Sequence, residues 1–306
     1  MQYLQILRPF NLVIVAITQF LVQHLVLVPA FQEAGLSAGL DIWHFSCLVL
    51  STVFIAASGY VINDIVDYEI DQVNKPEKLF IGKYIPVSTA YGYYVTLVGI
   101  GFILSFYLAY HISHLALLGL YPLAVALLFA YSKYLKQRVL LGNIIVGLFC
   151  AFVAGIVWFA ERQAYQQLWK ADAEQASYLQ FVLSFYLIFA FLSTIFREII
   201  KDVEDMEGDR LYDCRTLPIV YGIRNSKVVA GVFGILLLSC LSIMTVQVYQ
   251  QEYWIALGFL LLSLLLPNFL VLWQLSVARE RKDFKQLSRL AKLMMLSGLL
   301  LLFLLA

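Results

Sequence analysis

The chain has 306 residues, of which 62% are hydrophobic and 13% are charged, and its formal net charge is +1. Soluble globular proteins carry about 25% charged residues, so this composition excludes an ordinary soluble domain and indicates a protein embedded in the lipid bilayer. The basic residues are scattered and the net charge is small, which argues against a nucleic-acid partner. Nothing in the sequence implies a protein partner.

Apolar runs recur along the whole chain, and a membrane-spanning helix needs about 20 such residues. The runs between turn and charge signals predict nine spans, at 12–31, 45–62, 88–110, 115–131, 139–160, 179–196, 228–248, 254–275 and 290–306. The breaks at 111–114 and 249–252 are the least marked, so eight or ten spans are alternatives. No stretch is left for a soluble domain. We therefore expect an all-α integral membrane protein with a single domain over residues 1–306.

The first predicted span contains the polar residues Gln19, Gln23 and His24. Polar side chains at membrane depth usually face protein or water. An interhelical hydrogen bond is the favoured explanation over a role in lining a cavity. The four cysteines have no CxxC spacing and no nearby histidine that would indicate a metal site. These cysteines are Cys47, Cys150, Cys214 and Cys240. Three of the four lie in apolar runs, where we expect their side chains to pack against neighbouring helices.

Acidic residues follow the second predicted span in the segment NDIVDYEID, where Asp64, Asp67 and Asp71 are spaced i, i+3 and i+7. This spacing places three carboxylates on one face of a helix. Like charges at these spacings destabilise a helix by a few tenths of a kcal/mol per pair, so we expect a positive partner nearby.

The same spacing returns after the sixth predicted span, in REIIKDVEDMEGD, with Asp202, Asp205 and Asp209. A single acidic segment is often just a solvated loop, but two segments with matched spacing at membrane boundaries are harder to explain that way. Mg²⁺ prefers oxygen ligands and is commonly held by one or two carboxylates together with substrate phosphates. The two clusters therefore predict a Mg²⁺ site that binds a diphosphate, whose lipid-soluble isoprenoid tail would enter the membrane.

Basic residues predict the orientation of the spans, because Lys and Arg concentrate in cytoplasmic loops. With a cytoplasmic N-terminus, 19 of the 21 basic residues lie inside, and only Arg162 and Lys170 lie outside. We therefore expect the N-terminus and both acidic segments on the cytoplasmic side of the cell membrane. The basic stretch 279–292 is expected to be an inside loop near anionic headgroups.

The two acidic segments resemble the motifs of the UbiA superfamily of intramembrane prenyltransferases. The resemblance extends over nearly the whole chain and includes RPFN at 8–11, YSKYLK at 131–136 and LGN at 141–143. It implies about nine transmembrane helices around a central cavity with cytoplasmic cap loops. The second segment, followed by RTLP at 215–218, looks most like the branch that prenylates geranylgeranylglycerol phosphate in ether-lipid synthesis. One departure is NKP at 74–76 where the family commonly has Asn-Arg-Pro, which puts a phosphate contact by Lys75 in doubt.

The resemblance also implies roles for individual residues in prenyl transfer. The catalytic residues would be Asp64, Asp67, Asp202, Asp205 and Tyr131. The diphosphate would be contacted by Asn63, Lys136, Arg197, Lys201 and Arg8. The Mg²⁺ ligands would be Asn63, Asp64, Asp67, Asp71, Asp202, Asp205 and Asp209.

Tyr131 could stabilise a carbocation through its ring, although its position also suits an aromatic membrane anchor. Lys136 and Arg8 could equally serve only as determinants of topology.

Other functions remain as alternatives. The same chemistry could act on an aromatic quinone precursor, a chlorin or a haem. A transporter or a non-catalytic lipid-binding protein is a further alternative. Transporters carry ionisable residues at mid-membrane depth, whereas the acidic residues here gather at one boundary, which disfavours a transporter.

Overall fold

The computed structural model describes residues 2–74, 79–112, 115–211 and 214–305. Lys75 and Lys78 lie outside these residues. Within the described ranges, nine helical segments are long and apolar enough to cross a membrane, and they match the nine predicted spans in order. The prediction of an all-α membrane protein is confirmed. The expectation of a single domain stays a prediction.

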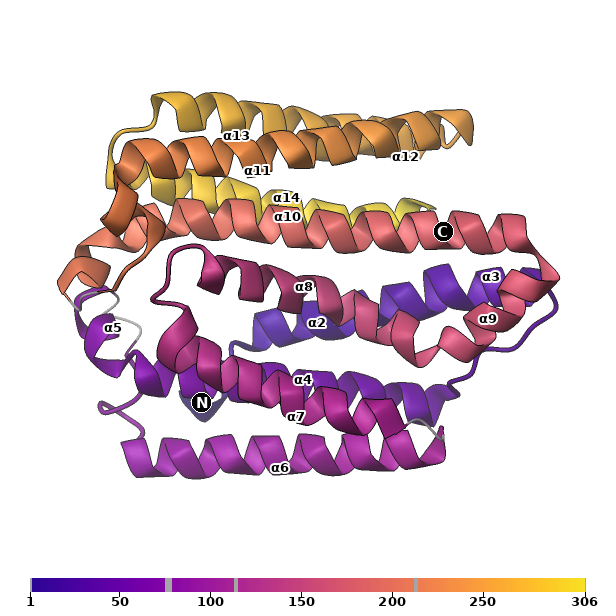
Figure 1. Ribbon diagram of the computed structural model, residues 1–306, viewed down its shortest axis with the longest axis horizontal. Helices are drawn as coiled ribbons and strands as arrows, with labels where there is room; N and C mark the ends of the chain where they lie inside the picture. The colour runs from indigo at the N-terminus through magenta and orange to yellow at the C-terminus, as the bar shows by residue number, and fades with distance from the viewer. Residues whose placement is uncertain (1, 75–78, 113–114, 212–213, 306) are drawn as a thin grey trace.

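The long helices lie side by side along the long axis of the molecule (Figure 1). The first half of the chain forms α1 (Gln2–Gln5), α2 (Pro9–Leu21), η1 (Val22–Leu27), α3 (Val28–Glu33), α4 (Ile42–Val66), α5 (Tyr68–Asn74), α6 (Val87–His111), α7 (Leu115–Ala130), η3 (Tyr131–Leu135) and α8 (Leu141–Ala160). The second half forms α9 (Arg162–Ala171), α10 (Ala173–Leu211), α11 (Leu217–Gln250), α12 (Trp254–Leu260), η4 (Leu261–Leu265), α13 (Leu266–Val277) and α14 (Arg281–Leu305).

Helix α10 is the central element of the bundle. In the most apolar stretch of α10, 61% of the residues are buried, against 11–44% in the corresponding stretches of the other spans. Helix α10 packs against α8, α11 and α14. Small residues allow these close contacts: a Cβ on Gly298 of α14 would lie 2.1 Å from the Phe189 ring of α10. The second acidic segment therefore continues directly from the most buried span of the described residues.

Two helices continue beyond the apolar runs that predicted the spans. Helix α10 extends past 196 to Leu211, so the second acidic segment is helical, as the spacing of its aspartates predicted. The basic stretch 279–292, expected to be a loop, is helical from Arg281 onward. Its first turns are amphipathic, with Phe284, Leu287 and Ala291 buried beneath the basic side chains.

The polar residues of the first span hydrogen-bond between helices, as expected for two of the three. Gln19 Nε2 donates to Thr52 Oγ1 at 3.0 Å and to the Val153 carbonyl at 3.1 Å. Gln23 Nε2 donates to Glu161 Oε1 at 2.7 Å. His24 instead packs its ring against Phe20 and Phe45. These contacts tie α2 and η1 to α4 and α8 within the membrane.

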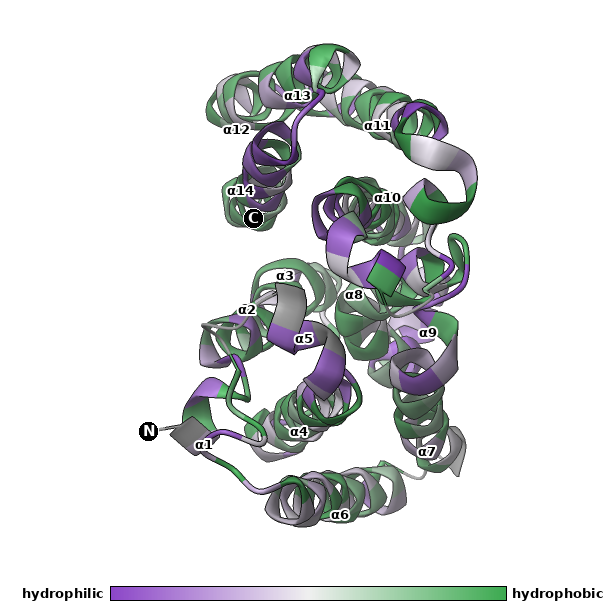
Figure 2. Cartoon of the chain, turned by 90° about the vertical axis from the view of Figure 1, so that its left-hand side faces the viewer, coloured by the Kyte–Doolittle hydropathy of each residue, from purple (hydrophilic) through white to green (hydrophobic). Residues whose placement is uncertain are grey.

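The end of the bundle that carries both acidic segments is polar. Helix α5, the η3–α8 connection and the C-terminal end of α10 lie at the left of Figure 1, and α9, which carries Arg162 and Lys170, lies at the opposite end. Seen end-on, hydrophilic residues mark α5 and the near ends of α10 and α14 (Figure 2). Helix α5 also packs against α10, which brings the two acidic segments to the same place.

Candidate active site

The first acidic cluster lies where α4 ends and α5 begins. Asn63 and Asp64 occupy the last turn of α4, Asp67 is the residue at the break between the helices, and Asp71 follows on α5. The spacing predicted that the three carboxylates lie on one face of a single helix. That prediction is wrong, because the helix breaks at Asp67. Asn63 Nδ2 donates to Asp67 Oδ2 at 2.9 Å, which orients this carboxylate.

Lys136 provides the positive partner that the first cluster was expected to need. Its Nζ donates to Asp67 Oδ1 at 2.5 Å and to Asn63 Oδ1 at 3.1 Å. Both charged side chains are largely buried, with 13% of Lys136 and 17% of Asp67 exposed. An ion pair so shielded is held more firmly than a surface pair, because breaking it would leave a buried charge without a partner.

A π-helical turn places Lys136 beside the first cluster. The segment η3 ends with the Lys136 amide donating to the Tyr131 carbonyl at 3.1 Å, five residues back. Two other π segments of the described residues, η1 and η4, precede Pro29 and Pro267, which cannot donate a helical hydrogen bond. No proline follows η3, and π turns of this kind occur frequently at functional sites.

Arg8 is the second cation at the first cluster. Its Nη2 donates to Asp64 Oδ1 at 2.6 Å, and its guanidinium lies 4.8 Å from the centre of the Tyr60 ring. Arg8 has a φ of 54°, a left-handed conformation that is unusual for a residue with a side chain. Burial alone would lower the pKa of Arg8, but the Asp64 charge raises the pKa above its ordinary value. Arg8 therefore stays charged.

The second cluster lies on one uninterrupted helix, α10, which carries Asp202, Asp205 and Asp209. Asn143, on the first turn of α8, donates from Nδ2 to Asp202 Oδ2 at 2.9 Å. Lys201 Nζ lies 3.9 Å from Asp205 Oδ2. Asp209 and Asp71 are further along their helices, and their charges act on Asp202 and Asp64 respectively.

Glu198 is a further acidic residue of α10 that lies at the site and was not predicted from the sequence. It forms an ion pair with Arg197 and lies 3.9 Å from Lys201 Nζ. The signal was present in the sequence, because Glu198 precedes Asp202 by four residues, one helical turn. Asn143 was also missed as a site residue.

The start of α8 connects the two clusters. A Cβ on Gly142 would lie 2.7 Å from Lys136 Cα, so the backbone carrying Lys136 rests directly on α8. The next residue, Asn143, bonds Asp202 of the other cluster. The Arg215 amide donates to the Gln137 carbonyl at 3.0 Å, which joins the segment after the second cluster to the same connection.

Tyr131 lies between the two clusters. The charges of Asp67, Asp202 and Glu198 all act on its side chain. All the predicted site residues are therefore at one end of the bundle, where the structure brings together both acidic clusters, their cationic partners and Tyr131.

The donor set suits Mg²⁺ held jointly with a ligand. Carboxylate and amide oxygens are the donors that Mg²⁺ prefers. Among the described residues, however, no three His, Cys, Asp or Glu side chains are close enough together to hold a metal alone. This arrangement fits an ion shared between one or two carboxylates and substrate phosphates, with Arg8, Lys136 and Lys201 balancing the carboxylate charge.

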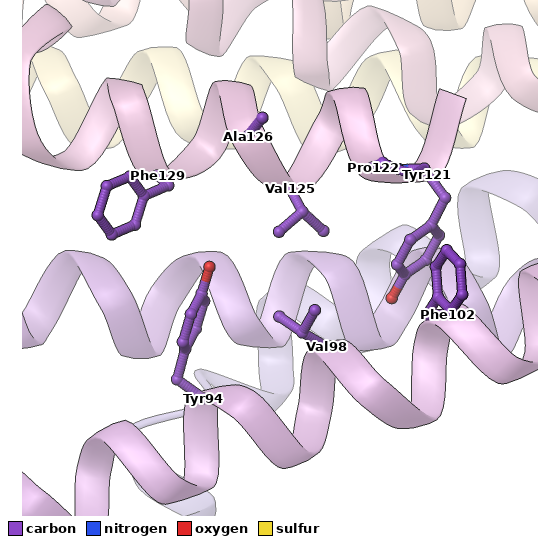
Figure 3. Close-up of a pocket in the computed structure, with 8 residues that line it drawn as sticks. All are labelled: Tyr94, Val98, Phe102, Tyr121, Pro122, Val125, Ala126 and Phe129. Atoms are coloured by element: carbon purple, nitrogen blue, oxygen red, sulfur yellow. The ribbon is translucent and has the colours of Figure 1, made fainter. Parts of the chain in front are cut away.

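A separate pocket of about 420 Å³ lies between α6 and α7 (Figure 3). Its lining is mainly apolar and consists of Tyr94, Val98, Phe102, Tyr121, Pro122, Val125, Ala126 and Phe129. None of these residues belongs to either acidic cluster, so this pocket is distinct from the candidate active site.

Comparisons with known proteins agree with this arrangement. The model of the UbiA prenyltransferase family matches residues 26–298. The chain is 35% identical over 236 residues to the digeranylgeranylglyceryl phosphate synthase of Methanothermobacter thermautotrophicus, covering 76% of this chain and 70% of that protein. It is 30% identical over 237 residues to the synthase of the same name from Sulfolobus acidocaldarius, covering 77% and 75%.

Solved structures share the fold. A structure described as giving insights into digeranylgeranylglyceryl phosphate synthase in membranes superposes with a TM-score of 0.66 at 23% identity, covering 98% of this chain and 96% of that one. A UbiA homolog from Archaeoglobus fulgidus bound to GPP and Mg²⁺ superposes with a TM-score of 0.55 at 15% identity, covering 99% and 100%. The chain belongs to the UbiA prenyltransferase family, and it is a multi-pass membrane enzyme that transfers prenyl groups.

Proposed function

We propose that this enzyme transfers a geranylgeranyl group from geranylgeranyl diphosphate to the free hydroxyl of geranylgeranylglycerol phosphate, forming the second ether bond of an ether lipid. The observation that carries the proposal is the pair of facing acidic clusters, with their lysines and arginines, around Tyr131 at one polar end of the bundle. The acceptor is supported by the relatives, several of which are named digeranylgeranylglyceryl phosphate synthase.

The diphosphate binds between the two clusters. Bound Mg²⁺ would be held by oxygens of Asn63, Asp64, Asp67, Asp71, Asp202, Asp205 and Asp209, and would stabilise the negative charge on the departing diphosphate. The A. fulgidus homolog was solved bound to GPP and Mg²⁺, which supports the pairing of a prenyl diphosphate with this metal. The prenyl chain extends from the clusters into the apolar bundle.

The cationic side chains of the site can also bind the diphosphate. Lys136, Arg8 and Lys201 neutralise carboxylates in the structure. With metal ions at those carboxylates, the cationic side chains would be free to donate to phosphate oxygens. Hydrogen bonds between charged groups are stronger than those between neutral groups. Arg197 is the fourth candidate and is paired with Glu198. Tyr131, between the clusters, faces the developing positive charge on C1 of the prenyl group.

The active site faces the cytoplasm in this proposal. Basic residues concentrate in cytoplasmic segments, and the acidic clusters share their end of the bundle with Lys136 and Arg8, whereas Arg162 and Lys170 lie on α9 at the other end (Figure 1). The N-terminus is then cytoplasmic as well.

The acceptor is tested with purified protein in detergent and labelled geranylgeranyl diphosphate. Geranylgeranylglycerol phosphate and 4-hydroxybenzoate are offered separately, each with Mg²⁺ or with EDTA. We expect Mg²⁺-dependent product from the glycerol phosphate only. Product from the aromatic acid alone would assign the enzyme to the aromatic branch, and undiminished product in EDTA would remove the metal from the proposal.

The two clusters are tested in the same assay by the substitutions Asp67→Asn and Asp202→Asn. Each removes a charge that stabilises the metal-bound diphosphate, and we expect kcat/KM to fall by about 100-fold or more. The matched control is Asp172→Asn, at the other end of α10, where the side chain accepts from the Gln175 amide at 2.9 Å and Asn can do the same. Equal activity in the three variants would contradict a catalytic role for the clusters.

A further inference from the structure

The two acidic clusters extend one helical turn further into the membrane than their aspartates. On α4, Tyr60 precedes Asp64 by four residues, and on α10, Glu198 precedes Asp202 by four residues. One turn of helix advances about 5.4 Å. Tyr60 and Glu198 therefore form a second layer, below the layer of aspartates and closer to the bilayer.

Tyr131 on the π turn η3 is the third member of the second layer, because η3 packs against α4 and α8, and α8 packs against α10. The charge of Glu198 acts on both Tyr60 and Tyr131 as well as on Asp202. Glu198 is 15% exposed and is accompanied by the cations Arg197 and Lys201. The two neighbouring cations favour the carboxylate form of Glu198 over the acid. The layer thus consists of two phenols and one carboxylate.

The reacting carbon must lie in this layer if the diphosphate lies among the aspartates. C1 of the prenyl group is joined directly to the diphosphate oxygen, and the rest of the chain runs toward the membrane. The acceptor hydroxyl attacks C1 and must lose its proton as the ether forms. Tyr60 and Tyr131 are phenols, which are protonated at neutral pH and are very weak bases in that form, so the Glu198 carboxylate is the most basic group of this layer.

We propose that Glu198 is the general base of the transfer reaction, taking the proton of the acceptor hydroxyl. The C1–O bond to the diphosphate breaks and its electron pair leaves with the diphosphate. The acceptor oxygen forms the new C1–O bond, and its proton passes to a Glu198 carboxylate oxygen. This role rests on the proposed function, because it needs a hydroxyl acceptor.

The test separates ionisation of the substrate from capture of C1. Geranylgeranyl diphosphate labelled with ¹⁸O in the C1–O bridge is incubated with enzyme and Mg²⁺, and movement of the label to non-bridging oxygens reports reversible ionisation. Transfer to geranylgeranylglycerol phosphate is measured alongside. For Glu198→Gln we expect transfer to fall by about 100-fold or more, the range for loss of a general base, with label movement within threefold of the unmodified enzyme.

Two further variants serve as controls for the effect of Glu198→Gln. Glu204→Gln removes a carboxylate from the same helix, outside the second layer, and should leave both rates unchanged. Glu198→Asp keeps the charge but shortens the side chain, so it should keep label movement and give intermediate transfer. It also decides the question if Glu198→Gln does not fold.

Three results would overturn the proposal. Transfer by Glu198→Gln within threefold of the unmodified enzyme would mean that the departing diphosphate or water takes the proton. Parallel loss of label movement and transfer would assign Glu198 to diphosphate binding. If the unmodified enzyme moves the label but makes no ether from the glycerol phosphate, the proposed acceptor is wrong and the base role fails with it, a result visible without any variant.

Discussion

Lys136 is the residue whose role the structure changes most. The sequence left open whether it determines topology or contacts phosphate, and the structure places its Nζ on Asp67 and Asn63 of the first cluster. A charged hydrogen bond contributes about 1.5–3 kcal/mol, which corresponds to about 10- to 100-fold in affinity. We expect Lys136→Gln to lower kcat/KM for the prenyl diphosphate by this factor.

The control for this prediction is Lys133→Gln on the same π turn. Lys133 is exposed, and its Nζ lies 5.3 Å from the centre of the Tyr134 ring, away from either cluster. It carries the same charge for topology, so kcat/KM of this variant should match that of the unmodified enzyme. Steady-state kinetics in detergent compare the two variants. Equal losses in both would mean that Lys136 acts only through the charge of the loop.

At the scale of one element, the start of α8 sets the distance between the clusters. Gly142 has space for no side chain, because a Cβ would lie 2.7 Å from Lys136 Cα and 3.3 Å from the Leu135 carbonyl oxygen. We expect Gly142→Ala to destabilise the fold by about 1–3 kcal/mol, the usual cost of overpacking. Displacement of Lys136 should also reduce kcat/KM. Thermal unfolding in detergent and steady-state kinetics measure the two effects.

Gly119→Ala on α7 is the matched control, since nothing lies within 4 Å of its Cβ position. Alanine is favoured over glycine in a helix by about 1 kcal/mol, so this variant should unfold at the same or a higher temperature. A Gly142→Ala enzyme with unchanged stability and activity would show that the connection between the clusters adapts, and that α8 does not fix their spacing.

At the scale of the whole molecule, the positions of the basic residues predict which end of the bundle faces the cytoplasm. In a chain whose four cysteines are replaced by serine, Lys133→Cys should react with a membrane-impermeant thiol reagent only when the cytoplasmic side is accessible. Lys170→Cys on α9 should react from the opposite side. Labelling of intact and inverted vesicles measures both. The reverse pattern would contradict the orientation.

Much of this architecture could be predicted from the sequence. The nine spans follow from apolar runs, and the pairing of the clusters follows from their repeated spacing. The break at Asp67 could not be predicted, because the spacing of Asp64, Asp67 and Asp71 also fits a continuous helix. The π turn at Tyr131 could not be predicted either, because one added residue in a helix changes the hydrophobic periodicity only slightly.

The missed site residues depend on tertiary contacts. Asn143 and Glu198 each occur at the end of an apolar run, where a polar residue commonly marks only the membrane boundary. Asn143 joins the site because the α7–α8 connection turns its amide toward Asp202. Glu198 joins because α10 continues as a helix beyond the apolar run. The contact of Asn143 cannot be read from residue spacing, whereas the four-residue spacing of Glu198 and Asp202 was a signal that is missed when only the aspartates are considered.

The central claim is that both acidic clusters bind one and the same diphosphate. The most direct test is the affinity of the purified protein for geranylgeranyl thiodiphosphate, a substrate analogue that resists ionisation, in the presence of Mg²⁺. We predict that Asp67→Asn and Asp202→Asn each weaken binding by about tenfold or more, the loss expected from one charged contact. If either variant binds the analogue as tightly as the unmodified enzyme, the diphosphate is held by one cluster alone and the account is contradicted.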